Sequence, residues 1–278
     1  MVTNMGTDQA NLDIYRAPEV VAHYAGLDSL TPCERLLFDT YLKAGMTLLD
    51  LGVGGGRTTP YLSGVASRYV GVDYAEEMIR VCRSKHPRLQ FEVADAADLS
   101  HFANCSFDAI VFSFNGIDYL APDKQRHRCL RECHRVLKSG GVFIFSSHNP
   151  QSLVVGWDWD WNRLRKRADR ITGGGKLLSG LVSAGLACAK LGLTLLRTGA
   201  QSIPRATRRI PTRMFWRGEG YWFDPTHGGL LTHCAVPSQV ISELEHCHFK
   251  LLQELPEDYP RPSRRWRTRW YYYAFSKS

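Results

Sequence analysis

A glycine-rich stretch near residue 50 has the residue types of a loop that holds a nucleotide-like ligand. The sequence from residue 48 to residue 58 is LLDLGVGGGRT, an apolar run followed by glycines and the start of a helix-like stretch. Glycine lets the backbone turn sharply and approach a ligand closely, because it has no Cβ. A helix that starts there offers free N–H groups to a polar ligand. This stretch therefore predicts a nucleotide-like ligand at the carboxyl end of a strand.

An acidic residue lies at the spacing expected for a partner of such a loop. Asp73 ends the next apolar run twenty-one residues after Gly52. A carboxylate there can accept hydrogen bonds from both hydroxyls of a ribose. The glycines follow a Gly-x-Gly-x-Gly pattern, however, and Arg57 stands where the dinucleotide fingerprint Gly-x-Gly-x-x-Gly has its third glycine. Because of this departure, an NAD-dependent Rossmann oxidoreductase is kept only as the alternative hypothesis. The stretch could also be a plain glycine turn that binds no ligand.

Side chains that could take or hold a proton follow later apolar runs. Asn115 and Asp118 come after the fourth run, His148 after the fifth, and His227 and His233 further along. His148 is the first candidate for a catalytic base, because an imidazole exchanges protons near neutral pH. A structural imidazole that caps the loop is an equally weighted interpretation. Asn115 and His227 are the other catalytic candidates, and Asn115 is also expected to touch a bound ligand through its amide.

The order of the elements predicts a framework that brings these residues together. Five β-rich runs alternate with helix-like stretches, as in parallel strands joined by helices in an α/β fold. The β-rich runs are residues 46–51, 69–72, 89–93, 107–112 and 141–146, and the helical stretches are residues 58–67, 75–85 and 122–138. After residue 150 the pattern breaks, and it resumes with a helix at 238–246 and strands at 249–254 and 270–275. Ligands of such sheets bind at the carboxyl ends of the strands.

These stretches resemble the class I S-adenosylmethionine-dependent methyltransferases. The resemblance covers residues 30–148 and the elements after residue 237, and it rests on DLGVGGG at 50–56, Asp73, Asp95-Ala96, FDAIVF at 107–112 and LKSGGVF at 137–143. It implies S-adenosyl-L-methionine as the cofactor and a seven-stranded, doubly wound Rossmann-like sheet whose last strand, 270–275, runs antiparallel beside the fifth. The cofactor-binding residues that it implies are Asp50, Gly52, Val53, Gly54, Gly56, Asp73, Tyr74, Asp95, Ala96 and Asn115.

The resemblance implies an enzyme but leaves the methyl acceptor open. A small-molecule or lipid-like acceptor, methylated on oxygen or nitrogen, is the favoured hypothesis. In the family the residues that face the acceptor follow the fourth and fifth strands, but their identities vary, so none is assigned by the resemblance. A protein that binds the cofactor without catalysis, as a scaffold, is a further alternative.

The chain divides into four predicted parts. These are an N-terminal helical segment at 1–45, a cofactor-binding core at 46–150, a basic and apolar cap insertion at 151–220 between strands 5 and 6, and a C-terminal completion of the core sheet at 221–278. Residues 221–229 mix aromatic side chains with an acid and an imidazole, which suits a pocket wall and a packed hairpin equally.

The insertion is the most unusual part of the sequence. Residues 151–220 contain thirteen Lys or Arg against four Asp or Glu, a net charge of +9, whereas the whole chain carries +8. Residues 177–196 are apolar apart from Lys190, but that charge and three glycines argue against a helix that crosses a membrane. A helical lid over the acceptor is the favoured hypothesis, and peripheral membrane contact through 157–217 is the second. Nucleic acid is the least favoured partner.

Composition sets the outer limits. With 44% hydrophobic and 22% charged residues, the chain is an ordinary globular protein, which excludes a disordered or fibrous class. The eight cysteines form no Cys-x-x-Cys pair, and the first residues lack the pattern of a secretory signal. We therefore expect reduced thiols and a cytoplasmic protein, with membrane association as the second interpretation. Neither Cys129, Cys133 and His134 nor the run 246–248 supplies four spaced ligands, so no metal is predicted.

Overall fold

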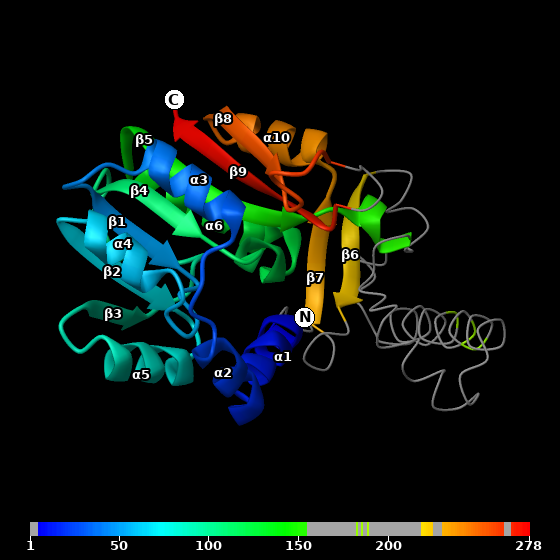
Figure 1. Ribbon diagram of the computed structural model, residues 1–278, viewed down its shortest axis with the longest axis horizontal. Coiled ribbons are helices and arrows are strands. Elements are labelled where there is room, and N and C mark those ends of the chain that lie inside the picture. Colours follow the sequence, from blue (N-terminus) through cyan, green and yellow to red (C-terminus); the bar gives the residue numbers. More distant parts are fainter. Residues whose placement is uncertain are drawn as a thin grey trace.

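A mixed seven-stranded sheet forms the centre of the protein (Figure 1), in a computed structural model that describes residues 5–154, 182, 185, 188, 218–224, 230–263 and 268–278. The strand order is β3-β2-β1-β4-β5-β9-β8. The strands of this sheet are β1 (Thr47–Leu51), β2 (Arg68–Asp73), β3 (Gln90–Val93), β4 (Phe107–Phe112), β5 (Leu137–His148), β8 (Phe249–Pro256) and β9 (Trp270–Lys277). The first five run parallel, whereas β9 pairs antiparallel with both β5 and β8. The predicted Rossmann-like sheet and the antiparallel place of its last strand are thus confirmed.

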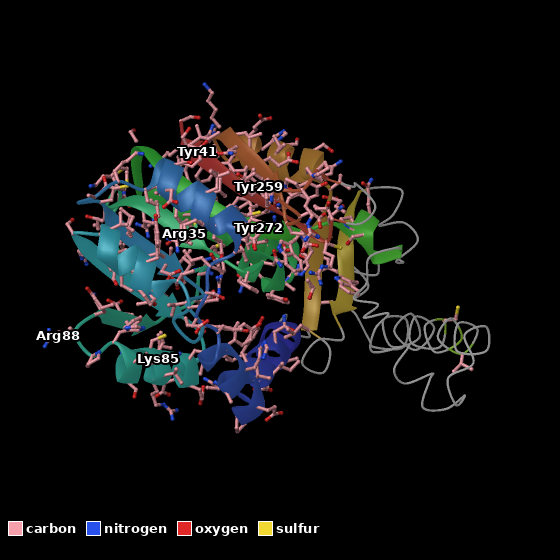
Figure 2. All side chains as sticks on the ribbon, in the orientation of Figure 1. Arg35, Tyr41, Lys85, Arg88, Tyr259 and Tyr272 are labelled. Atoms are coloured by element: carbon pink, nitrogen blue, oxygen red, sulfur yellow. The ribbon has the colours of Figure 1, made fainter. Side chains whose placement is uncertain are left out.

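Helices cover both faces of this sheet, so its strands are buried on both sides. The helices are α1 (Met5–Arg16), α2 (Pro18–Ala25), α3 (Pro32–Tyr41), α4 (Thr59–Val65), α5 (Glu76–Lys85), α6 (Asp123–Val136) and α10 (Pro237–His246), with short 3₁₀ turns η1 (Gly116–Tyr119) and η2 (Pro150–Val154). One apolar core contains Leu130 of α6 and Leu244 of α10. The other contains Phe38 of α3 and Leu62 of α4. Tyr272 of β9 belongs to this second core and lies beside α3 (Figure 2).

The predicted boundaries differ most around the fifth strand. The sequence predicts a helix to residue 138 and a strand from 141, whereas α6 ends at Val136 and β5 begins at Leu137. Leu137 is fully buried and pairs with Phe107 before the register shifts. Gly140 takes a positive φ of 71°, which only glycine adopts easily. The strand therefore starts before the Ser-Gly-Gly sequence that resembles a helix stop.

Three helices precede β1, as the predicted helical segment requires. The third is fixed by a capping box, because the Thr31 side chain accepts from the Glu34 N–H and the Glu34 carboxylate accepts from the Thr31 N–H. That carboxylate also accepts two hydrogen bonds from the guanidinium of Arg57, and both side chains are buried. The residue that distinguishes the glycine loop from a dinucleotide loop thus ties the loop to α3.

A separate two-stranded sheet stands beside the main one. Strands β6 (Glu219–Asp224) and β7 (Leu230–Ala235) pair antiparallel, so residues 221–224 belong to a hairpin, one of the two expected forms. Figure 1 shows the lower end of β7 next to α1. The side chains of Tyr221 and Leu231 form a small apolar cluster with Ala121, which holds the hairpin against the segment after β4. Within the predicted C-terminal part, β8 and β9 join the main sheet.

Much of the predicted cap insertion lies outside the described residues. This applies to the tryptophans and arginines of 157–170 and to all but three positions of the apolar stretch 177–196. His227, which follows the insertion, also lies outside the described residues. Across the described ranges, no helix is long and apolar enough to span a bilayer. The cap therefore stays a prediction.

Candidate functional site

The principal pocket opens at the carboxyl ends of the strands β1, β2, β3 and β4. Its empty volume is about 1000 Å³, including the open mouth. The walls come from the glycine loop, from the ends of β2 and β3, from the segment after β4 and from α1 and α2. The loops after successive parallel strands thus meet at one edge, as the order of elements predicted.

The glycine loop has a shape that side chains would destroy. Gly52, Gly54 and Gly56 take φ values of 59°, 53° and 84°. A Cβ on Gly52 would lie 2.7 Å from the ring of Phe112, and a Cβ on Gly55 would lie 2.3 Å from the carbonyl oxygen of Tyr24. Gly52 and Gly54 line the pocket, whereas Gly56 is not among the lining residues. Only glycine fits at position 55 because the backbone of α2 packs against it, a contact that the sequence did not reveal.

Asp73 lies at the pocket wall with acceptor capacity to spare. Its Oδ2 accepts from the Gly54 N–H at 2.9 Å, and its Oδ1 accepts from the Ala75 N–H at 2.9 Å. A carboxylate offers about four acceptor sites, so these bonds do not exhaust its capacity for a ligand. Burial raises the pKa of Asp73 to about 6, although hydrogen bonds from Ala75, Gly54 and Tyr74 oppose the shift. This geometry suits an acceptor of two ribose hydroxyls.

Asp50 lies beneath the loop and outside the pocket wall. Its Oδ2 accepts from the Thr58 hydroxyl at 2.7 Å and from the Tyr69 hydroxyl at 2.8 Å. Burial raises the pKa of Asp50 to about 6, against the effect of these two bonds. Thr58 itself lines the pocket. Asp50 therefore holds the end of the loop in place from below.

The remaining predicted cofactor residues divide between the wall and its surroundings. Val53, Tyr74, Asp95 and Ala96 line the pocket. The Oδ1 of Asp95 accepts from the N–H of Ala97 at 2.8 Å, which fixes the turn after β3. Asn115 is not a lining residue, and its amide points toward the end of β5 instead.

Four tyrosines line one side of the pocket, and only Tyr74 among them was predicted. Tyr15, Tyr24, Tyr74 and Tyr119 all line it, and the ring of Tyr15 lies 5.8–5.9 Å from each of the other three ring centres. Aromatic pairs at such distances and tilts stabilise one another beyond simple burial. Tyr15 comes from α1, so the N-terminal helices form part of the binding wall.

Asn11 fixes α1 over the pocket. Its Nδ2 donates to the carbonyl oxygens of Leu231 and Tyr119, and its Oδ1 accepts from the Leu231 N–H. The side chain is 2% exposed, so water competes little for these bonds. Lys85 adds a second attachment, because its ammonium group donates to carbonyl oxygens of Ala25 and Gly55. Figure 2 labels Lys85 on α5, beside the lower helices.

A buried polar cluster adjoins the pocket at the ends of β4 and β5. The Oδ2 of Asp118 lies 2.9 Å from the Nδ1 of His148 and 2.6 Å from its backbone nitrogen. The Nδ2 of Asn115 lies 3.3 Å from the Nε2 of the same ring. Tyr119, which lines the pocket, packs edge-on against this ring at 6.1 Å. Asn115, Asp118 and His148 are thus brought together, as their places after β4 and β5 suggested.

A buried arginine holds this cluster from behind. Arg126 of α6 donates to Oδ1 of Asp118 at 3.0 Å and makes a forked pair with Glu243 of α10. His233 of β7 has its Nδ1 3.9 Å from the same Asp118 oxygen. Burial alone raises the pKa of Asp118, but the hydrogen bond from His148, the nearby imidazole of His233 and the charge of Arg126 bring it well below its usual range. The carboxylate therefore stays ionised.

Comparison with known proteins identifies the domain that carries this pocket. A family model described as a methyltransferase domain matches residues 49–145, which include the glycine loop, Asp73, Asp95 and Asp118. The chain contains a class I S-adenosylmethionine-dependent methyltransferase domain. The matched residues end within β5.

Curated relatives agree with that assignment over part of their length. The chain is 32% identical over 124 residues to a probable S-adenosylmethionine-dependent methyltransferase of Mycolicibacterium smegmatis, which covers 45% of this chain and 46% of that protein. It is 38% identical over 104 residues to a demethylmenaquinone methyltransferase of Clavibacter sepedonicus, covering 36% and 40%. The chain thus matches about half the length of these relatives or less.

A solved structure shows the same fold over nearly the whole chain. A structure from Methanosarcina mazei, described as a S-adenosylmethionine-dependent methyltransferase, superimposes with a TM-score of 0.57 at 20% identity. The match covers 90% of this chain and 99% of that one. At this identity the likeness concerns the fold. It includes the sheet, which differs from the all-parallel 3-2-1-4-5-6 order of the dinucleotide fold that the alternative hypothesis required.

The methyltransferase pocket has the features that S-adenosylmethionine needs. The glycine loop leaves space where a Cβ would intrude, and Asp73 keeps free acceptor sites for a ribose. The charged residues of the wall are Asp73, Asp95 and Arg57, and the charge of Arg57 is balanced by Glu34. The wall is therefore negative on balance, which suits a sulfonium cation. Among the residues that the structure describes, no three His, Cys, Asp or Glu side chains gather as metal ligands.

Proposed function

We propose that the protein transfers a methyl group from S-adenosylmethionine to a small-molecule or lipid-like acceptor. The observation that carries this proposal is the pocket at the carboxyl ends of the strands, where the glycine loop and Asp73 meet a wall of aromatic side chains. The cofactor supplies a methyl group on a positively charged sulfur. The task of the chain is to hold that group and the acceptor in line.

In this proposal the cofactor lies along the ends of β1, β2 and β3. The N–H groups of the glycine loop face its polar methionine end, and Asp73 accepts from its ribose. Asp95 and Ala96 bind the adenine edge, and Tyr74 packs against the adenine. Asp50 acts through Thr58, because its carboxylate is buried under the loop.

The acceptor occupies the other half of the pocket, next to η1. The wall there is aromatic, with Phe112, Phe114 and Tyr119, and it borders the polar cluster at His148. An apolar wall with few polar groups is typical of sites for small organic ligands. The Clavibacter relative is named for a demethylmenaquinone substrate, which is a lipid-like quinone. Residues 151–220 cover the acceptor in this proposal, as the sequence predicted.

Two measurements test the proposed function. Calorimetry of the purified protein is expected to detect binding of S-adenosylhomocysteine, with no competition from NADH. Incubation with S-adenosylmethionine carrying a labelled methyl group and a small-molecule and lipid extract is expected to yield a labelled product. Tight binding of NADH in place of S-adenosylhomocysteine would indicate an oxidoreductase. Cofactor binding without a labelled product from any extract fraction would indicate a scaffold.

A further inference from the structure

The polar cluster behind η1 has the arrangement of a proton-accepting site. We infer that His148, oriented by Asp118, takes a proton from the methyl acceptor, so that the acceptor reacts through a hydroxyl or an N–H group. This inference rests on the proposed function and narrows the class of acceptor. It assigns His148 a catalytic role and Asp118 a positioning role.

The hydrogen bonds determine which nitrogen of His148 can accept a proton. An ionised carboxylate only accepts hydrogen bonds, so the Nδ1 that lies 2.9 Å from Asp118 carries the ring proton. In a neutral ring Nε2 then carries the lone pair that can take a proton. It lies 3.3 Å from the Nδ2 of Asn115, and the residues on either side of Asn115 line the pocket. The ring is 13% exposed, which keeps it rigid yet reachable.

The charged groups around the ring leave a net negative charge. Within the described residues, the ionisable groups near His148 or its carboxylate partner include Asp118, Tyr119, Arg126, His233, Cys234 and Tyr273, and Glu243 lies behind Arg126 with His127 beside it. Two carboxylates and one guanidinium leave the cluster with one excess negative charge. A proton on His148 removes that excess at the place where the ring meets Asp118.

Asn115 can accommodate either state of the ring. Its Oδ1 is buried without a hydrogen-bond partner, whereas its Nδ2 faces Nε2 of His148. With a neutral ring, the amide N–H donates to Nε2. Once Nε2 is protonated, a half-turn of the amide brings Oδ1 to face it as an acceptor. The Oδ1 of Asn115 can thus accept a hydrogen bond from the protonated ring of His148. A histidine that only capped the loop would not need such an acceptor.

The step balances in atoms and charge. The acceptor oxygen or nitrogen forms a bond to the methyl carbon while the carbon–sulfur bond breaks, and the sulfur keeps that electron pair. The amide N–H of Asn115 turns away from Nε2 of His148, and the proton of the acceptor passes to that nitrogen. The positive charge that leaves the sulfur therefore ends on the imidazole, beside Asp118, until solvent takes the proton.

The first test replaces the imidazole and then returns it from solution. His148→Gly is expected to lower labelled-methyl transfer to the extract acceptor by about a hundredfold, the scale of general-base catalysis. Added imidazole restores part of the rate, and more basic methylimidazoles of similar size restore more of it. Affinity for S-adenosylhomocysteine stays the same. His101→Gly is the matched control, since His101 is 40% exposed and pairs with Glu92 away from the cluster.

The second test observes the ring without cofactor or acceptor. Nuclear magnetic resonance of the protein with ¹⁵N-labelled histidine is expected to show His148 with its proton on Nδ1. Asp118→Asn removes that preference and lowers transfer, and imidazole does not restore its rate because the pocket is still filled by the ring. If Asp118→Asn does not fold, His148→Gly still decides the question.

The outcomes separate this inference from the proposed function. Wild-type protein that forms no labelled product contradicts the proposed function itself. Wild-type activity together with full activity of His148→Gly overturns the inference alone. A loss that added bases restore equally, whatever their basicity, also overturns it, because the ring would then only fill space.

Discussion

The two edges of the pocket bury carboxylates in opposite ways. On the cofactor side, Asp50 and Asp73 are held by hydroxyls and backbone N–H groups, and burial raises the pKa of each to about 6. On the acceptor side, Asp118 is equally buried, but Arg126 and two imidazoles bring its pKa well below its usual range. Neutral donors suit the proposed binding of ribose hydroxyls by Asp73. A charged partner suits the proposed role of Asp118 beside a transient imidazolium.

The two edges also differ in the sequence separation of the residues that form them. The glycine loop and Asp73 are within about twenty residues of each other and bind through backbone geometry. The acceptor side joins Asn11, Asp118, Arg126, His148 and Glu243 through side chains. The first group is therefore set by local sequence, whereas the second depends on the packing of distant elements.

Removing the buried guanidinium is expected to have the largest effect on stability. Arg126→Met leaves Asp118 and Glu243 buried without their cation, which costs about 3–5 kcal/mol in the free energy of unfolding. Urea unfolding measures it. Arg80→Met is the control, because Arg80 is 61% exposed and its pairs with Glu76 and Glu77 contribute about 0–1 kcal/mol. Equal losses of unfolding free energy in both variants would contradict the conclusion that Asp118 depends on a buried cation.

Asp73→Ala tests the cofactor side. Loss of a charged acceptor is expected to weaken binding of S-adenosylhomocysteine by about 1.5–3 kcal/mol, measured by calorimetry. Asp98→Ala is the matched control, since Asp98 lies in the turn after β3, is 49% exposed and does not line the pocket. Unchanged affinity in Asp73→Ala would remove Asp73 from the site.

Asn11→Ala tests whether the side chain of Asn11 holds α1 in place beside the pocket. The change leaves the N–H of Leu231 and two carbonyl oxygens without their partner and is expected to cost about 2 kcal/mol. Amide hydrogen exchange should become faster in α1 while β1 stays protected. Glu19→Ala, an exposed position on α2, is the control. If exchange in α1 stays as slow as in the wild type, the side chain does not hold the helix.

The raised pKa of Asp73 predicts a pH dependence with opposite signs for binding and stability. Cofactor binding uses the ionised form, so affinity falls by about tenfold, or about 1.4 kcal/mol, for each pH unit below about 6. A carboxyl whose pKa is raised by folding adds stability below its unfolded value, and that contribution is lost as the pH rises through about 6. Calorimetry measures the trend in binding and urea unfolding measures the trend in stability, each at steps of about half a unit from about pH 4.5 to about pH 7.5. Asp73→Asn should flatten the binding curve.

The sequence allowed a good prediction of the strands around the glycine loop because their signals are local. The apolar runs, the glycines and Asp73 follow one another at short spacing, and their strands begin and end within a few residues of the predicted positions. Where the fifth strand was misplaced, Leu137 pairs with Phe107, thirty positions earlier in the chain. A pattern of neighbouring residues cannot contain that information.

The acceptor side could be predicted only in part. His148, Asn115 and Asp118 could be predicted as site residues because they follow strands. Nothing in the sequence near Arg126 indicates that it forms an ion pair with Glu243. Tyr15 was missed for the same reason, since its partners come from three other elements. One signal was available and unused. Thr31 and Glu34 have the spacing of a capping box and mark the start of α3.

The place of β9 has a consequence for how the chain folds during synthesis. β9 follows β8 in the chain but lies between β5 and β8 in the sheet, so β5 lacks one neighbour until residue 270 has been made. At ribosomal speeds, the residues after β5 take roughly 10 s to appear. During that time the apolar edge of β5 is open to pairing with other chains. We therefore expect newly made protein to depend on chaperones until β9 is inserted.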